Sequence, residues 1–109
     1  MDLKMAFAMF QKIAEKTGFA LAENMVGYCF GKGKGVEQNW TKAVEWYTKA
    51  AEKGDSCAMC NIGCCFYSGE GVEQNLAKAL EWYTKAQDAG DEEAGAEINA
   101  IRERLQNNA

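Results

Sequence analysis

The chain has 109 residues, with 12 Lys and Arg against 16 Asp and Glu, a formal net charge of −4, and neither His nor Pro. Its length predicts one small domain spanning 1–109, and its acidic balance argues against nucleic acid as a partner because phosphate binding needs clustered basic residues. The lack of histidine removes the commonest metal ligand and general base. No run of residues is basic enough to bind an anionic lipid surface or apolar enough to span a bilayer, so we expect no membrane partner.

Residues 1–18 predict the first helix, which Gly18 ends as a residue able to adopt positive φ. The segment does not resemble a signal peptide. Asp2 stands where a basic region is expected, and Gln11 and Lys12 interrupt the apolar stretch. We therefore expect an intracellular, cytoplasmic protein.

A 36-residue repeat dominates the rest of the chain. Residues 33–50 read GKGVEQNWTKAVEWYTKA and residues 69–86 read GEGVEQNLAKALEWYTKA, which agree at 14 of 18 positions. A period of 20 to 50 residues is typical of architectures in which each unit buries its apolar face against its neighbour.

Each copy of the repeat predicts one amphipathic helix. Asn39 and Asn75 stand just before the apolar periodic runs and are expected to cap them. Gly54 and Gly90 are expected to end them. The apolar side chains recur at i, i+3, i+4 and i+7: Ala43, Trp46, Tyr47 and Ala50 in one copy, and Ala79, Trp82, Tyr83 and Ala86 in the other. We expect these side chains to form the core.

Three further helices are predicted around these two. They cover about 19–31, 56–68 and 92–106, the last two capped by Asp55 and Asp91. The last helix has a polar outer face, which is typical of a helix that caps a repeat stack. The glycine-rich segments 31–35 and 69–71 predict turns between helices. They lack the strand context of a nucleotide-binding loop.

Core, loop and cap positions together resemble the Sel-1-like repeat. The matching residues are Ala58, Ile62, Gly63, Phe66, Gly69, Gly71, Val72, Asn75, Lys78, Ala79, Trp82, Tyr83, Lys85, Ala86 and Gly90, with the corresponding residues of the preceding unit. The resemblance implies an all-α fold, a right-handed α-solenoid of tetratricopeptide-like helix pairs with about two and a half repeats. The expected units are 1–18 (the helix of a degenerate repeat), 19–54 (repeat 1), 55–90 (repeat 2) and 91–109 (capping helix).

The same resemblance implies a protein–protein interaction module or adaptor and not an enzyme. Members of the family often receive a peptide or a partner helix in their concave groove. We therefore expect another protein or peptide as the partner, and no cofactor. Self-association through one flank of the short stack is a further possibility.

The five cysteines fall into two groups. Cys29 and Cys65 are 36 residues apart at one repeat position and are expected in the core. Cys57, Cys60 and Cys64 lie at i, i+3 and i+7 of one helix. The tetratricopeptide register places these three thiols on the concave face. The partner-binding residues implied by this register are Asn24, Tyr28, Cys57, Cys60, Cys64 and Tyr67.

A redox or metal-binding protein that uses Cys57, Cys60 and Cys64 is the alternative function. Cys57 and Cys60 form a CxxC at a helix start, where the macrodipole lowers a thiol pKa, although Asp55 opposes this effect. One metal cannot take all three thiolates from a straight helix, because Cys57 and Cys64 are roughly 10 Å apart along the axis. The disulfide pattern of the family's cysteine-rich secreted branch is also missing, since Ala51 and Met59 occupy its positions.

Overall fold

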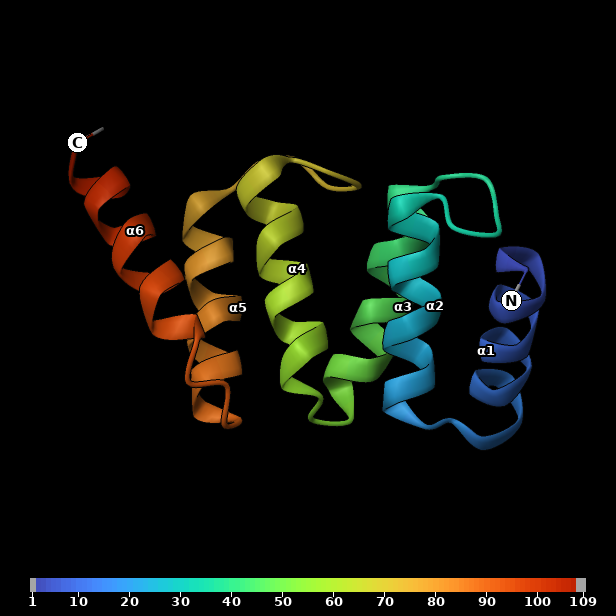
Figure 1. Ribbon diagram of the computed structural model, residues 1–109. Helices are drawn as coiled ribbons and strands as arrows, with labels where there is room; N and C mark the ends of the chain where they lie inside the picture. Colours follow the sequence, from blue (N-terminus) through green and yellow to red (C-terminus); the bar gives the residue numbers. More distant parts are fainter. Residues whose placement is uncertain (1, 108–109) are drawn as a thin grey trace.

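The computed structural model describes residues 2–107, which form six α-helices and no strand. The helices are α1 (Leu3–Thr17), α2 (Ala20–Lys32), α3 (Trp40–Glu52), α4 (Ser56–Ser68), α5 (Leu76–Asp88) and α6 (Ala94–Asn107). They form an elongated stack of 46 × 26 × 21 Å (Figure 1). The expected all-α solenoid is confirmed.

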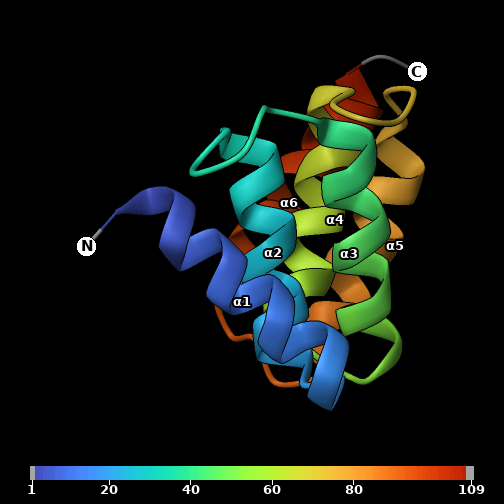
Figure 2. The same ribbon diagram turned by 90° about the vertical axis from the view of Figure 1, so that its right-hand side faces the viewer.

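The helices stack in chain order. The extensive contacts all join consecutive helices, with the closest packing within the pairs α2–α3 and α4–α5. Figure 2 shows α2 on one side of the stack and α3 and α5 on the other, with α4 between them and α1 at the near end. The face of the stack that carries α2 and α4 is therefore built from the first helix of each pair.

The helix boundaries largely follow the predicted caps. The side chains of Asn39 and Asn75 accept hydrogen bonds from the backbone N–H groups of Lys42 and Lys78, both at 3.0 Å. The carboxylate of Asp55 accepts from the backbone of the first turn of α4. These contacts satisfy amides that have no partner within the helix.

The last helix starts later than the sequence predicts. It begins at Ala94 and not near Glu92, because Glu92 and Glu93 form a turn. The backbone N–H of Glu93 donates to Asp91 Oδ1 at 2.9 Å, and Asp91 Oδ2 accepts from the thiol of Cys60 at 2.8 Å. Asp91 therefore closes a turn and contacts α4 instead of capping α6 directly.

A glycine in the first helix of each pair lets a tyrosine of the second helix pack closely. A Cβ on Gly27 would lie 2.7 Å from the ring of Tyr47, and one on Gly63 would lie 3.0 Å from the ring of Tyr83. Both tyrosines are buried, as are Cys29 and Cys65. The core positions predicted for these four side chains are confirmed.

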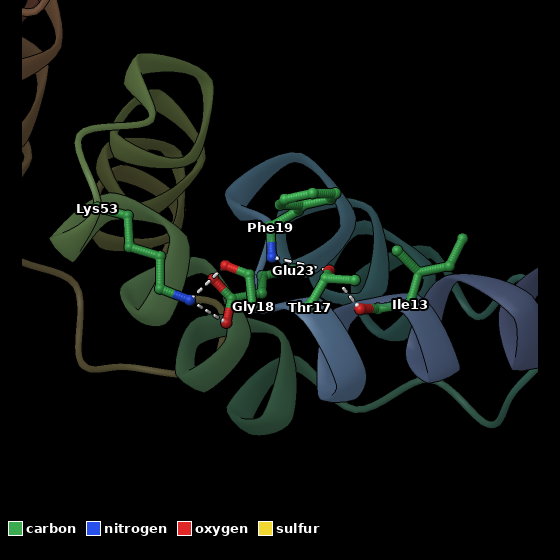
Figure 3. A network of polar contacts seen from close by, with 6 residues as sticks. All are labelled: Ile13, Thr17, Gly18, Phe19, Glu23 and Lys53. Carbon is green, nitrogen blue, oxygen red and sulfur yellow. Dashed lines mark hydrogen bonds and ion pairs between the residues drawn. The ribbon is translucent and has the colours of Figure 1, made fainter.

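One polar contact joins the first two helices to the end of the third. Lys53 Nζ donates to Glu23 Oε2 at 2.8 Å and to the carbonyl of Gly18 at 2.6 Å (Figure 3). The side chain of Glu23 is 6% exposed, whereas that of Lys53 is 45% exposed. This ion pair does not recur in the second unit, because the positions 36 residues later hold the uncharged Met59 and Ala89.

Candidate functional site

The exposed side of α2 and α4 carries most of the predicted partner-binding side chains. Cys57 and Cys64 are exposed on α4, Cys60 and Tyr67 are half-buried beside them, and Tyr28 is half-buried on α2. We call the surface formed by these five residues the α2–α4 face. The i, i+3, i+7 and i+10 spacing from Cys57 to Tyr67 places the four α4 side chains along one stripe of the helix.

Asn24 does not belong to this surface. Its side chain is only 8% exposed, and its Oδ1 accepts a hydrogen bond from Asn61 Nδ2 at 2.9 Å. Asn24 therefore joins α2 to α4 beneath the face. The sequence predicts that Asn24 contacts a partner. In the structure its amide is buried and hydrogen-bonded, so it is not available at the surface and supports the face from beneath.

A pocket of about 240 Å³ opens on the α2–α4 face where α4 meets α5 and α6. Its lining consists of Cys60, Cys64, Tyr83, Asp91, Glu93, Ala94 and Glu97. Cys60 donates to Asp91, and the Cys64 thiol lies 2.8 Å from the hydroxyl of Tyr83. These two hydrogen bonds tie both thiols to other residues of the pocket lining.

The electrostatics at Cys57 and Cys60 favour the protonated thiols. Burial raises the pKa of Cys60, and its hydrogen bond to Asp91 and the charge of that carboxylate raise it further. Burial also raises the pKa of Cys57, with added repulsion from Asp55, Asp91 and Glu93. Because the thiolate is the nucleophile and the metal ligand, this environment disfavours the redox and metal-binding alternative.

Two aromatic rings on the face each lie beneath a basic side chain. Lys34 Nζ is 5.3 Å from the ring centroid of Tyr28, and the guanidinium of Arg104 is 5.2 Å from that of Tyr67. These are cation–π distances. Each ring therefore has a basic side chain over one of its faces, from the loop after α2 for Tyr28 and from α6 for Tyr67.

The pocket also contains residues that the sequence did not assign to a site. The sequence predicts Asp91 as a helix cap and Tyr83 as a core residue. Tyr83 is buried as predicted, whereas Asp91 closes the turn before α6. Their contacts with Cys60 and Cys64 span 31 and 19 residues. The 36-residue alignment gives no sign of these contacts, because the first repeat has Asn24 and Tyr28 at the two cysteine positions.

All five cysteines lie in the described part of the chain and are free thiols. Among residues 2–107, no three His, Cys, Asp or Glu side chains are grouped closely enough to hold a metal ion. None of the described helices combines the length and the apolar character that a membrane crossing requires.

Comparison with known proteins identifies relatives of this chain. The sequence model of the Sel1 repeat matches residues 2–17, 20–55 and 58–91. No curated protein sequence matches the chain. A Sel1 repeat protein from Oxalobacter formigenes has a TM-score of 0.81 and 37% identity over 90% of this chain. A protective antigen of uropathogenic Escherichia coli strains that displays the same repeat fold has a TM-score of 0.80 and 35% identity over 85%.

Cysteine rich protein B of Helicobacter pylori is also similar, with a TM-score of 0.78 and 26% identity over 88% of this chain. The chain spans 71% of that protein, but only 40% and 20% of the Oxalobacter and Escherichia proteins. Proteins built from this repeat are in general interaction modules without catalytic activity.

Proposed function

Since the chain belongs to the Sel1 repeat family, we propose that it is an interaction module that binds a peptide or a partner helix on the α2–α4 face. The observation that carries the proposal is the pocket at Cys60 and Cys64, flanked on the same face by Tyr28 and Tyr67. A concave site with apolar walls and a few fixed polar groups is the usual form of a specific binding surface.

The charges around the pocket favour a basic partner. Asp91, Glu93 and Glu97 line it, and no Lys or Arg of the described chain is among its lining residues. A Lys or Arg side chain of the partner placed here is attracted electrostatically by the three carboxylates. This attraction favours a partner with the complementary charge and speeds its association. Charges on the pocket rim are weakened by salt, so binding is expected to weaken as ionic strength rises.

The tyrosines supply the apolar part of the contact. Their rings combine a large contact area with only two side-chain torsions, and tyrosine is common among residues that dominate binding energy. The Lys34 and Arg104 contacts hold both rings in place before a partner arrives, which lowers the entropy cost of binding.

A displayed library of random peptides, selected on the whole chain, tests the proposal because it samples many candidate partner sequences at once. We expect the selected peptides to be enriched in Lys and Arg. Affinity measured by calorimetry should fall about 10-fold or more in Tyr67→Ala and in Tyr28→Ala. Glu97→Gln should weaken binding at low salt and change it less at high salt.

Glu81→Ala is the matched control, because Glu81 is an exposed carboxylate on α5 outside the pocket. Circular dichroism should show the same helix content in all four variants. Peptides that bind the wild type and all four variants equally would contradict the proposed site.

A further inference from the structure

The exposed large hydrophobic side chains of residues 2–107 gather at one end of the stack. Within the described residues, the large hydrophobic side chains that are exposed are Leu3, Met5, Met9, Ile13, Phe19 and Leu21. They lie on α1 and at the start of α2, at the end of the stack opposite α6 (Figure 1). We call these six residues the α1 face.

α1 is apolar on two sides. Its inner side packs on the stack through Phe7 and Ala14, and the ring of Phe7 contacts that of Phe30 edge-on at 5.2 Å. Its outer side carries Met5, Met9 and Ile13 at i, i+4 and i+8, so they form a continuous row. A helix that is apolar on more than one side is normally buried on those sides.

The row continues into a cavity of about 350 Å³. The lining residues are Phe10, Ile13, Phe19, Leu21, Ala22 and Met25, and they offer only apolar surface. The cavity is large enough to receive a methionine or leucine side chain. The α1 face thus has both projecting side chains and a recess, which is what a self-complementary contact requires.

We propose that the α1 face binds the α1 face of a second copy of this chain, with the two α1 helices antiparallel about a two-fold axis at Met9. In this arrangement Met9 meets its own counterpart and Met5 meets Ile13 of the second copy. The N-terminal end of each α1, with Leu3, lies beside Phe19 and Leu21 of the second copy, so all six exposed side chains are covered.

The area and the charges support a second copy as the occupant. The six residues expose on the order of 700 Å², close to the roughly 800 Å² that each partner contributes to a standard interface. The antiparallel arrangement also brings Asp2 near Lys16 of the second copy. Unlike charges therefore meet at both ends of the apolar row.

The opposite end of the stack does not offer an equivalent surface. The outward side chains of α6 include Glu97, Arg102 and Glu103, and its apolar residues Ile98 and Ile101 are buried against α5. A head-to-tail contact would place the α1 face against these charges. The two-fold contact instead pairs apolar surface with apolar surface and leaves α6 in solvent.

Sedimentation velocity of the whole chain over a micromolar concentration series tests this proposal. We expect a monomer–dimer equilibrium. Met9→Glu should raise the dissociation constant about 100-fold or more, because the two-fold axis brings two carboxylates together in an apolar contact. Ala96→Glu, which places the same charge on an exposed position of α6, should leave the dimer unchanged.

The position of the axis is tested by mixing variants. Met9→Glu and Met9→Lys should each be monomeric alone, whereas an equimolar mixture should form a heterodimer because the two charges then meet. Circular dichroism should show unchanged helix content, since Met9 is 50% exposed. A wild type that stays monomeric throughout the series, or a mixture that associates no better than its components, would overturn the proposal.

Discussion

Lys53 and Glu23 form an ion pair at 2.8 Å that joins the end of α3 to the start of α2 (Figure 3). The same ammonium donates to the carbonyl of Gly18, the residue that ends α1. Three helices thus meet at one side chain. Because the second repeat has Met59 and Ala89 at these positions, the contact is particular to the first junction of the stack.

Replacing the lysine tests how much this contact stabilises the fold. Lys53→Ala leaves a carboxylate that is almost fully buried without its cation, so we expect the free energy of unfolding to fall by about 1–3 kcal/mol. The expected loss of stability is smaller than for a fully buried ion pair, because the lysine side chain is 45% exposed and partly screened by water. Urea denaturation measures it.

The repeat itself supplies the control for this prediction. The double variant Glu23→Met with Lys53→Ala recreates the pair found at Met59 and Ala89, and it removes the buried charge together with its partner. We expect it to recover most of the lost stability. A double variant as unstable as Lys53→Ala alone would show that the loss does not come from the unpaired carboxylate.

Gly27 is expected to resist substitution although it lies inside a helix. Alanine there gains helix propensity, yet its Cβ would lie 2.7 Å from the buried ring of Tyr47. We expect Gly27→Ala to destabilise the chain by about 1–3 kcal/mol through overpacking. Gly95→Ala is the control, because a Cβ at this position would meet only the flexible amide of Gln87. The melting temperature of this variant should not fall.

The repeat explains why so much of the fold could be predicted. Each of its copies contains its own cap, apolar row and terminal glycine, so the local signals at Asn39 and at Asn75 agree with each other and with the tertiary packing. The clear difference in helix boundaries, the start of α6, falls where the repeat ends. There Asp91 contacts Cys60, a residue of another helix, and local cap rules do not include such a contact.

The site was less predictable than the fold. Helical spacing correctly placed Cys57, Cys60 and Cys64 on one stripe, because the separation of residues along a helix determines which of them share a side. It could not show that Asn24 would be covered and bonded to Asn61, since burial of a position depends on how neighbouring helices are tilted. Nor could it show that Asp91 would complete the pocket from 31 residues away.

The reactivity of Cys60 offers a direct test of the pocket electrostatics. Burial and the hydrogen bond to Asp91 raise its pKa, so the thiol should react slowly with iodoacetamide near pH 8. Asp91→Asn removes the negative charge beside it, and we expect the rate of alkylation to rise several-fold. Mass spectrometry of the peptide that contains Cys60, in a chain with Cys57→Ser and Cys64→Ser, measures the rate.

Glu92→Gln is the control for this experiment, because it removes an exposed carboxylate of the same turn that is not among the groups that raise the pKa of Cys60. An equal rate in the wild type and in Asp91→Asn would show that the carboxylate does not set the reactivity. Fast alkylation of wild-type Cys60 at neutral pH would instead favour a thiol-dependent function for this face.

The stability of the chain should fall at alkaline pH. Burial raises the pKa of Cys65 to about 12, with a further contribution from Cys64 and Glu70, whereas an unfolded cysteine ionises near about 8.5. Between these two pKa values the unfolded chain releases a proton that the folded chain keeps. The unfolded state therefore binds fewer protons, and the free energy of unfolding decreases by up to about 1.4 kcal/mol per pH unit for this one thiol.

Urea midpoints measured at about pH 7.5 and pH 9.5 under reducing conditions test this expectation, since only the second value lies above the pKa of an unfolded thiol. Cys65→Ala provides the comparison. It lowers stability at both pH values because it leaves a small cavity, but it also removes the group that ionises. We therefore expect the difference between the two midpoints to be smaller in Cys65→Ala than in the wild type. If both proteins lose the same stability between the two pH values, the buried thiol of Cys65 does not control the alkaline response.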